Sequence, residues 1–221
     1  MCGISGSNNK DTAFKLYQSS LHRGYYSSGA LILDDEEHYT CKKVLGEFTK
    51  PVEADSAPGI WLNGLYYLYH SRGPTTETRE FIKDNNHPFF YGKWIVSHNG
   101  IISNFSPLWE KYGEGSVSGK TDSSVIPRIL NSTNNIKETL EQLEGTFALW
   151  IYNTTSREIF ITRCGSTLFA NLNTGDFSST EFENSVSLDE GKIYQIYYQN
   201  KDRTGIVERE EYKANSPYFV F

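Results

Sequence analysis

The residue whose position first suggests chemistry is Cys2, which directly follows Met1. A small residue at position 2 permits removal of Met1, and that removal would leave a thiol and a free α-amine on one residue. A thiolate is intrinsically nucleophilic, and an α-amine that titrates near pH ~8 can act as its base. Cys2 therefore has the groups needed for N-terminal nucleophilic catalysis. The alternative is that Cys2 is a small buried hydrophobic residue at the start of a strand.

Further short motifs rich in Gly, His, Asn and Arg follow Cys2 along the chain. In chain order they are Met1-Cys2-Gly3-Ile4-Ser5-Gly6, Leu21-His22-Arg23-Gly24-Tyr25-Tyr26-Ser27-Ser28-Gly29, His70-Ser71-Arg72-Gly73, Asn86-His87-Pro88-Phe89, Ser97-His98-Asn99-Gly100, Thr121-Asp122-Ser123, Glu144-Gly145-Thr146-Phe147-Ala148 and Thr162-Arg163-Cys164-Gly165-Ser166.

In this order the motifs resemble the class II glutamine amidotransferase domain, a member of the N-terminal nucleophile hydrolases. That domain supplies ammonia in asparagine synthetase, in glucosamine-6-phosphate synthase and in the amidotransferase that begins purine synthesis. The resemblance extends from residue 2 to about residue 196. It implies that Cys2 attacks the side-chain amide of glutamine, that ammonia leaves, and that water resolves the thioester to glutamate.

The resemblance also implies the catalytic partners of Cys2. Asn99 and Gly100 match the family's oxyanion hole, formed by an Asn side-chain amide and a Gly backbone N–H. Such a donor contributes about 2.7–4 kcal/mol in the transition state. Between two apolar runs, however, Asn-Gly is also the strongest short signal for a hairpin turn.

Four residues match substrate-binding positions of the family: Arg72 for the α-carboxylate, Asp122 for the α-ammonium, Thr75, and His87 near the nucleophile. Arg72, Asp122 and His87 each have a structural alternative. Arg72 could form a surface ion pair, and Asp122 could cap a helix that starts at Ser123. His87, like His22, could be a structural histidine.

Two positions depart from the family. Tyr26 stands where many relatives carry Asp, and Gly73-Pro74 follows Arg72 where relatives often carry an aromatic and a small residue.

The leading hypothesis is a glutaminase that passes ammonia to a separate synthase subunit. The alternatives are a stand-alone hydrolase of another γ-glutamyl amide or peptide, and a catalytically silent relative that binds glutamine or a partner protein.

Strand-like patterns dominate the chain, so the elements that must position these residues are mostly strands. Runs of β-branched and aromatic residues predict strands at 30–33, 39–44, 61–70, 94–98, 146–152, 158–163, 192–198 and 206–211. Helical spacing predicts helices at 12–20, 123–130 and 135–143. Many strands and few helices without strict alternation indicate an α+β fold. The resemblance refines this to a four-layer α-β-β-α sandwich of two antiparallel sheets, a single domain over residues 1–221, in which Cys2 begins a central strand.

Composition restricts the other partners. The net charge of −6 argues against nucleic acid and anionic membrane surfaces, and no apolar run approaches membrane-spanning length. The three cysteines lack a CxxC spacing, and the five histidines show no metal-ligand spacing. The first residues contain no basic stretch followed by an apolar one, as a secretory signal peptide would. We therefore expect a cytoplasmic protein with neither metal nor cofactor.

Overall fold

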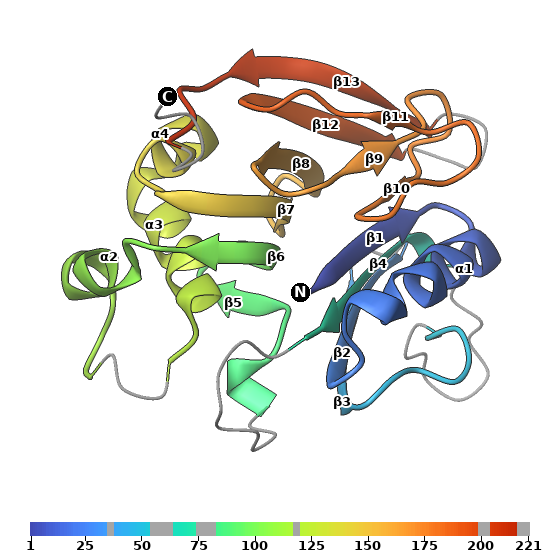
Figure 1. Ribbon diagram of the computed structural model, residues 1–221, viewed down its shortest axis with the longest axis horizontal. Helices are drawn as coiled ribbons and strands as arrows, with labels where there is room; N and C mark the ends of the chain where they lie inside the picture. The colour runs from blue at the N-terminus through green and yellow to red at the C-terminus, as the bar shows by residue number, and fades with distance from the viewer. Residues whose placement is uncertain (35–37, 54–63, 74–82, 117–119, 199–203, 216–221) are drawn as a thin grey trace.

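Two antiparallel sheets face each other, and helices cover the outer side of each (Figure 1). This computed structural model describes residues 1–34, 38–53, 64–73, 83–116, 120–198 and 204–215. The first sheet has the order β11-β9-β10-β1-β4-β2-β3 and the second the order β13-β12-β8-β7-β6-β5. The predicted α+β sandwich is confirmed.

Each of the eight predicted runs overlaps a strand, although residues 61–63 of the run predicted at 61–70 lie outside the described residues. The short strands at 89–91, 169–170, 177–178 and 186–187 were not predicted. The first sheet contains β1 (Gly3–Ser7), β2 (Ser27–Asp34), β3 (Tyr39–Leu45), β4 (Gly64–Arg72), β9 (Phe169–Ala170), β10 (Phe177–Ser178) and β11 (Val186–Ser187). The second contains β5 (Phe89–Tyr91), β6 (Trp94–Ile102), β7 (Gly145–Asn153), β8 (Glu158–Cys164), β12 (Lys192–Tyr198) and β13 (Thr204–Glu211).

Strand β2 shows why the sheets form layers. Leu31 and Leu33 belong to the core between the two sheets, whereas Ala30 and Ile32 belong to the core under helix α1. Alternate side chains of a strand point to opposite faces, so an apolar strand of this kind must be covered on both sides. Each fully buried Leu or Ile contributes about 1.5–3 kcal/mol.

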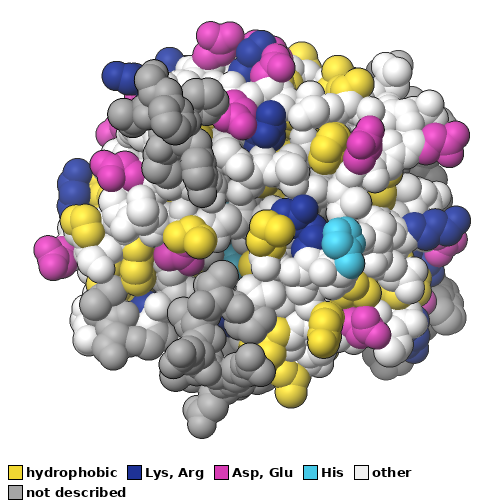
Figure 2. Space-filling model, in the orientation of Figure 1, with side chains coloured by type: hydrophobic (Ala, Val, Ile, Leu, Met, Phe, Trp, Pro, Cys, Tyr) yellow, Lys and Arg dark blue, Asp and Glu magenta, His cyan; other side chains and the backbone are white. Residues whose placement is uncertain are grey.

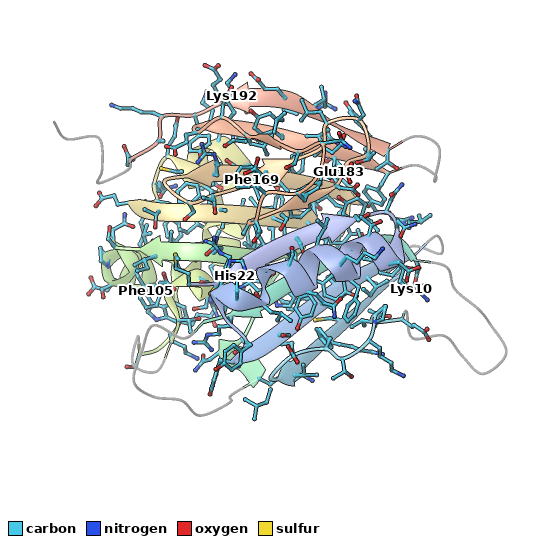
Figure 3. All side chains as sticks on the ribbon, turned by 45° about the vertical axis from the view of Figure 1, so that its right-hand side comes forward. Lys10, His22, Phe105, Phe169, Glu183 and Lys192 are labelled. Carbon is cyan, nitrogen blue, oxygen red and sulfur yellow. The ribbon has the colours of Figure 1, made fainter. Side chains whose placement is uncertain are left out.

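Helix α1 (Lys10–Ser20) covers the outer face of the first sheet. The side chain of Asn9 caps it by accepting from the N–H groups of Asp11 and Thr12. A 3₁₀ turn (Leu21–Arg23) follows, and its exposed His22 lies at the opposite end of this segment from Lys10 (Figure 3).

Helices α2 (Phe105–Tyr112), α3 (Ile126–Thr133) and α4 (Ile136–Leu140) pack on the second sheet. Helix α3 begins directly after the 3₁₀ turn η3 (Asp122–Val125), which lies against β6. Helix α2 was not predicted, and the helix predicted from residue 123 is divided between η3 and α3. In the described ranges, no helix combines the length and apolarity needed to cross a membrane.

Candidate active site

Cys2 lies directly before β1, a strand in the middle of the first sheet, between β4 and β10. Gly3 pairs with Ser71 of β4, which brings Cys2 to the end of β4. The Sγ of the half-buried Cys2 lies 3.9 Å from the Gly73 carbonyl oxygen. Figure 1 places the N-terminus where β1 approaches the second sheet, and Figure 2 shows basic, histidine and hydrophobic side chains near the same place.

The surroundings of Cys2 favour the protonated thiol. Burial raises the pKa of the Cys2 thiol above its usual value. A hydrogen bond with the Gly73 backbone, the N-terminal ammonium and the Arg72 charge oppose this increase, and the Asp122 carboxylate adds to it. Arg72 and Asp122 therefore both act electrostatically on the Cys2 thiol.

Close backbone approaches hold the segment around Cys2. Arg23 Nε donates to the Cys2 carbonyl oxygen over 2.9 Å. A side chain at Gly24 would collide with the backbone of Gly73, and one at Gly73 would collide with the backbone of Met1 and the Arg23 carbonyl. Only glycine fits where these strand ends meet.

Asn99 and Gly100 lie inside strand β6, so the hairpin interpretation of Asn-Gly is wrong. They pair with Ala148 and Phe147 of β7. Gly100 has φ +149°, and a Cβ there would collide with the Thr146 carbonyl, so tertiary pairing rather than a turn requires the glycine. The buried side chain of Asn99 donates from Nδ2 to Ser179 Oγ over 3.2 Å.

Arg72 ends β4 and is partly buried. Its Nη1 donates to the Asn85 carbonyl over 2.9 Å and to Asn86 Oδ1 over 2.8 Å, and its guanidinium lies 5.9 Å from the centre of the Tyr26 ring. These acceptors are neutral, so the hydrogen bonds orient the guanidinium without neutralising it. Tyr26, at the position where relatives carry Asp, thus borders the same arginine.

Asp122 is the first residue of η3, and Thr121 rather than Asp122 occupies the N-cap position. One carboxylate oxygen accepts from the Ile102 N–H over 2.8 Å, and the other accepts from the Ser123 N–H over 2.8 Å. The carboxylate therefore joins η3 to the end of β6, three residues after Asn99. The alternative that Asp122 is the N-cap of a helix starting at Ser123 is therefore wrong, because Asp122 is already the first residue of η3.

His87 belongs to a cluster of three buried histidines beside the candidate site. Its ring stacks on His70 with 3.8 Å between centroids, and neither ring nitrogen of His87 has a hydrogen-bond partner among the described residues. His70 Nε2 lies 3.2 Å from the His98 carbonyl, and His98 Nδ1 lies 2.8 Å from Ser123 Oγ. Burial lowers the pKa of all three, that of His70 to about 3.

The structure therefore brings together most of the predicted site residues, while Thr75 lies outside the described residues. Within the described ranges, no three His, Cys, Asp or Glu residues form a metal-binding group. Ser179 and the hydrogen bond between His98 and Ser123 were missed by sequence reasoning. A serine carries no chemical signal of its own, and only the pairing of β10 with β1 reveals its place.

A thiol at the leading end of a central strand, in a four-layer sandwich of two antiparallel sheets, defines the fold class of the N-terminal nucleophile hydrolases. The glutamine phosphoribosylpyrophosphate amidotransferase of B. subtilis, solved with ADP and GMP, has this fold. It superposes with a TM-score of 0.70 at 19% identity, covering 95% of this chain and 49% of that one.

Comparison with known sequences then gives the family. A glutamine amidotransferase domain family matches residues 78–173. The glutamine–fructose-6-phosphate aminotransferase (isomerizing) of Methanococcus maripaludis is 30% identical over 182 residues, 73% of this chain and 29% of that protein. The 7-cyano-7-deazaguanine synthase of Saccharolobus solfataricus is 31% identical over 173 residues, 68% of this chain and 36% of that protein.

The chain belongs to the class II glutamine amidotransferase domains. It spans well under half the length of these curated relatives, for instance 40% of the Escherichia coli glutamine–fructose-6-phosphate aminotransferase (isomerizing).

The buried histidines make stability depend on pH. Because the pKa of folded His70 is about 3, below the 6.5 of an unfolded histidine, the unfolded state binds more protons between these values. The stabilisation is complete above pH 6.5 and is lost as the pH falls toward 3. We expect His70→Gln to reduce the slope of unfolding free energy against pH by about 1.4 kcal/mol per pH unit near pH 5.5.

Urea unfolding at several pH values measures this slope. Between pH 7.5 and 8.5 the variant and the native chain should have equal slopes, whatever stability the variant has lost, because a histidine does not titrate there. Equal slopes between pH 5 and 6 would contradict the neutral, buried state of His70.

Proposed function

We propose that this chain hydrolyses the side-chain amide of glutamine to glutamate and ammonia, with Cys2 as the nucleophile after Met1 has been removed. The observation that carries the proposal is the position of the Cys2 thiol, which lies against Gly73 and within the electrostatic influence of Arg72 and Asp122. One thiol is thereby placed beside a cation and an anion that suit the two charged ends of a free amino acid.

Removal of Met1 has two effects in this proposal. With Met1 attached, the nitrogen of Cys2 belongs to a peptide bond and cannot accept a proton. The backbone of Met1 also lies against Gly73, next to the thiol. Its removal supplies the α-amine as a base and opens space beside Cys2 at the same time.

The reaction then follows from the groups present. The α-amine of Cys2 takes the thiol proton, and Sγ bonds to the amide carbon while the carbonyl π-electrons move to oxygen. The Nδ2–H of Asn99 and the N–H of Gly100 stabilise that oxyanion. The C–N bond breaks, nitrogen takes the proton from the α-ammonium, and ammonia leaves a thioester. Water attacks the thioester, releases glutamate and restores the thiol.

The remaining residues hold the amino-acid end of glutamine. Arg72 uses Nη1 on two amide oxygens, and a guanidinium has five N–H donors, so donors remain for the α-carboxylate. Asp122 accepts from two backbone N–H groups and from Ser123 Oγ, and a carboxylate has about four acceptor sites, which leaves one for the α-ammonium. His87, a buried ring stacked on His70, and Thr75 complete the proposed substrate-binding set.

We further propose that a partner synthase consumes the ammonia. The relatives described above are an aminotransferase, a synthase and an amidotransferase, and this chain spans less than half the length of each. Ammonia released into water at neutral pH is mostly protonated and is lost as a nucleophile, so transfer to a synthase docked over the site would preserve it. In this proposal the synthase is a separate subunit.

The test of the nucleophile is the substitution of Cys2. Cys2→Ala and Cys2→Ser should lower kcat for glutamine hydrolysis about 10³-fold or more, while the unfolding free energy changes little. Cys41→Ala, which removes another half-buried thiol on β3, should retain full activity. Mass spectrometry should find the native chain without Met1 and Cys2 labelled by a glutamine-derived electrophile. Full glutaminase activity in Cys2→Ala would contradict the proposal.

Arg72 and Asn99 should affect different kinetic constants. Arg72 holds the part of glutamine that does not react, so Arg72→Ala should mainly raise KM. Asn99 meets charge that exists only in the transition state, so Asn99→Ala should mainly lower kcat, by about 10² or more. Steady-state glutamate release measures both. An Asn99→Ala variant with native kcat would place the oxyanion donor elsewhere.

The partner proposal concerns the rate of the isolated chain. The chain alone should hydrolyse glutamine slowly, and a synthase from the same genome should raise kcat/KM about tenfold, within the usual range of coupling between sites. Glutamate release, measured with and without each candidate synthase, tests this. Rapid hydrolysis that no synthase alters, or hydrolysis of another γ-glutamyl amide in place of glutamine, would exclude the partner model.

A further inference from the structure

Ser179 lies directly after β10 and is 1% exposed. Its N–H donates to the Ile4 carbonyl over 2.8 Å, and its Oγ accepts from the Ile4 N–H over 3.1 Å. Ser179 therefore extends the pairing of β10 with β1 by one residue, with its side chain taking the place of a backbone acceptor. Ile4 is two residues from Cys2, so this contact fixes the strand that carries the thiol.

The same hydroxyl also contacts the second sheet. Asn99 of β6 donates from Nδ2 to Ser179 Oγ over 3.2 Å. A hydroxyl oxygen has two lone pairs, and Ile4 and Asn99 occupy both of them. The amide of Asn99 has two N–H groups; one is committed to Ser179, and the other is left for an oxyanion.

The position of Ser179 is itself fixed. Its carbonyl accepts from Thr167 Oγ1 over 2.8 Å, which anchors the segment after β10 to the segment before β9. The Ile4 N–H and the Asn99 amide, which donate to the Ser179 hydroxyl, are both buried. Water therefore does not readily replace this hydroxyl as their acceptor. One buried oxygen thus connects the strand of the nucleophile with the side chain assigned to the oxyanion hole.

We propose that Ser179 is a positioning residue for amide hydrolysis: its hydroxyl holds the Asn99 amide in the orientation that meets the oxyanion formed at Cys2. This inference rests on the proposed function, because it assigns Ser179 a role through Asn99. Without the hydroxyl, Nδ2 loses its acceptor and the amide can rotate about its terminal side-chain bond, a broad two-fold torsion. Misplacement of a catalytic donor by about 1 Å can cost about 10²-fold in rate.

The experiment measures kcat and KM for glutamine in the full chain. Ser179→Ala should lower kcat about 10- to 100-fold and leave KM nearly unchanged. Ser179→Cys keeps the shape of the residue with a weaker acceptor and should give an intermediate kcat. Ser178→Ala is the matched control: Ser178 is an adjacent buried serine whose Oγ accepts from the Thr180 N–H, and its loss should leave kcat unchanged.

A double-mutant cycle separates positioning from a merely structural role. If Ser179 acts through Asn99, Ser179→Ala should have no further effect on kcat in an Asn99→Ala background. The inference would be overturned if the reductions in kcat caused by Ser179→Ala and Asn99→Ala multiply in the double variant. A native kcat in a folded Ser179→Ala variant would also overturn it. If Ser179→Ala does not fold, Ser179→Cys takes its place in the same double-mutant cycle with Asn99→Ala. Failure of the proposed function can be distinguished from failure of this inference. If the proposed function is wrong, the native chain itself shows no glutaminase activity that depends on Cys2.

Discussion

The candidate site depends on the register of β1 against β4. Gly3 pairs with Ser71 and Ile4 with His70, so Cys2 comes to lie where β4 ends. A slip of one residue would turn every side chain of β1 to the opposite layer. Ile4 would leave the core between the sheets and take the place of Gly3, where even a Cβ would collide with Ser20 and Ser71. The packing of Ile4 on one face of β1 and the lack of space at Gly3 on the other therefore fix the position of the Cys2 thiol. The thiol itself makes neither of these contacts.

A second constraint is the close approach of backbone segments beside Cys2. The chain passes Cys2 again at Arg23–Gly24, after α1, and at Gly73, after β4, and these backbones touch without an intervening side chain. Glycine costs about 0.5–1 kcal/mol of conformational entropy compared with alanine, and here it permits contacts that no other residue could make. Arg23 then adds a hydrogen bond to the Cys2 carbonyl, so the backbone of the proposed nucleophile is held in place.

Much of the fold could be predicted because β2, β4, β6 and β7 are long and apolar, and strand patterns of that kind persist in any tertiary context. Helix α2 was missed because Pro107 lies within its eight residues, where it suggests a loop. Asn99-Gly100 has the local signature of a turn, and only the pairing of β6 with β7 makes it part of a strand. Ser179 could not be found at all, since its role consists of contacts with residues 80 and 175 positions away.

The electrostatics of the site explain why an N-terminal amine suits this thiol as its base. Burial raises the pKa of the Cys2 thiol, so the site does not produce a standing thiolate, and the nearby Asp122 carboxylate makes ionisation still harder. The neighbouring histidines are poor bases as well, because burial lowers the pKa of His70 to about 3 and that of His98 below its usual value. An α-amine on the same residue is within reach of the thiol by covalent geometry alone and titrates near pH ~8. In the proposed mechanism the chain therefore needs no separate base, and with Met1 still attached the nitrogen of Cys2 could not take that role.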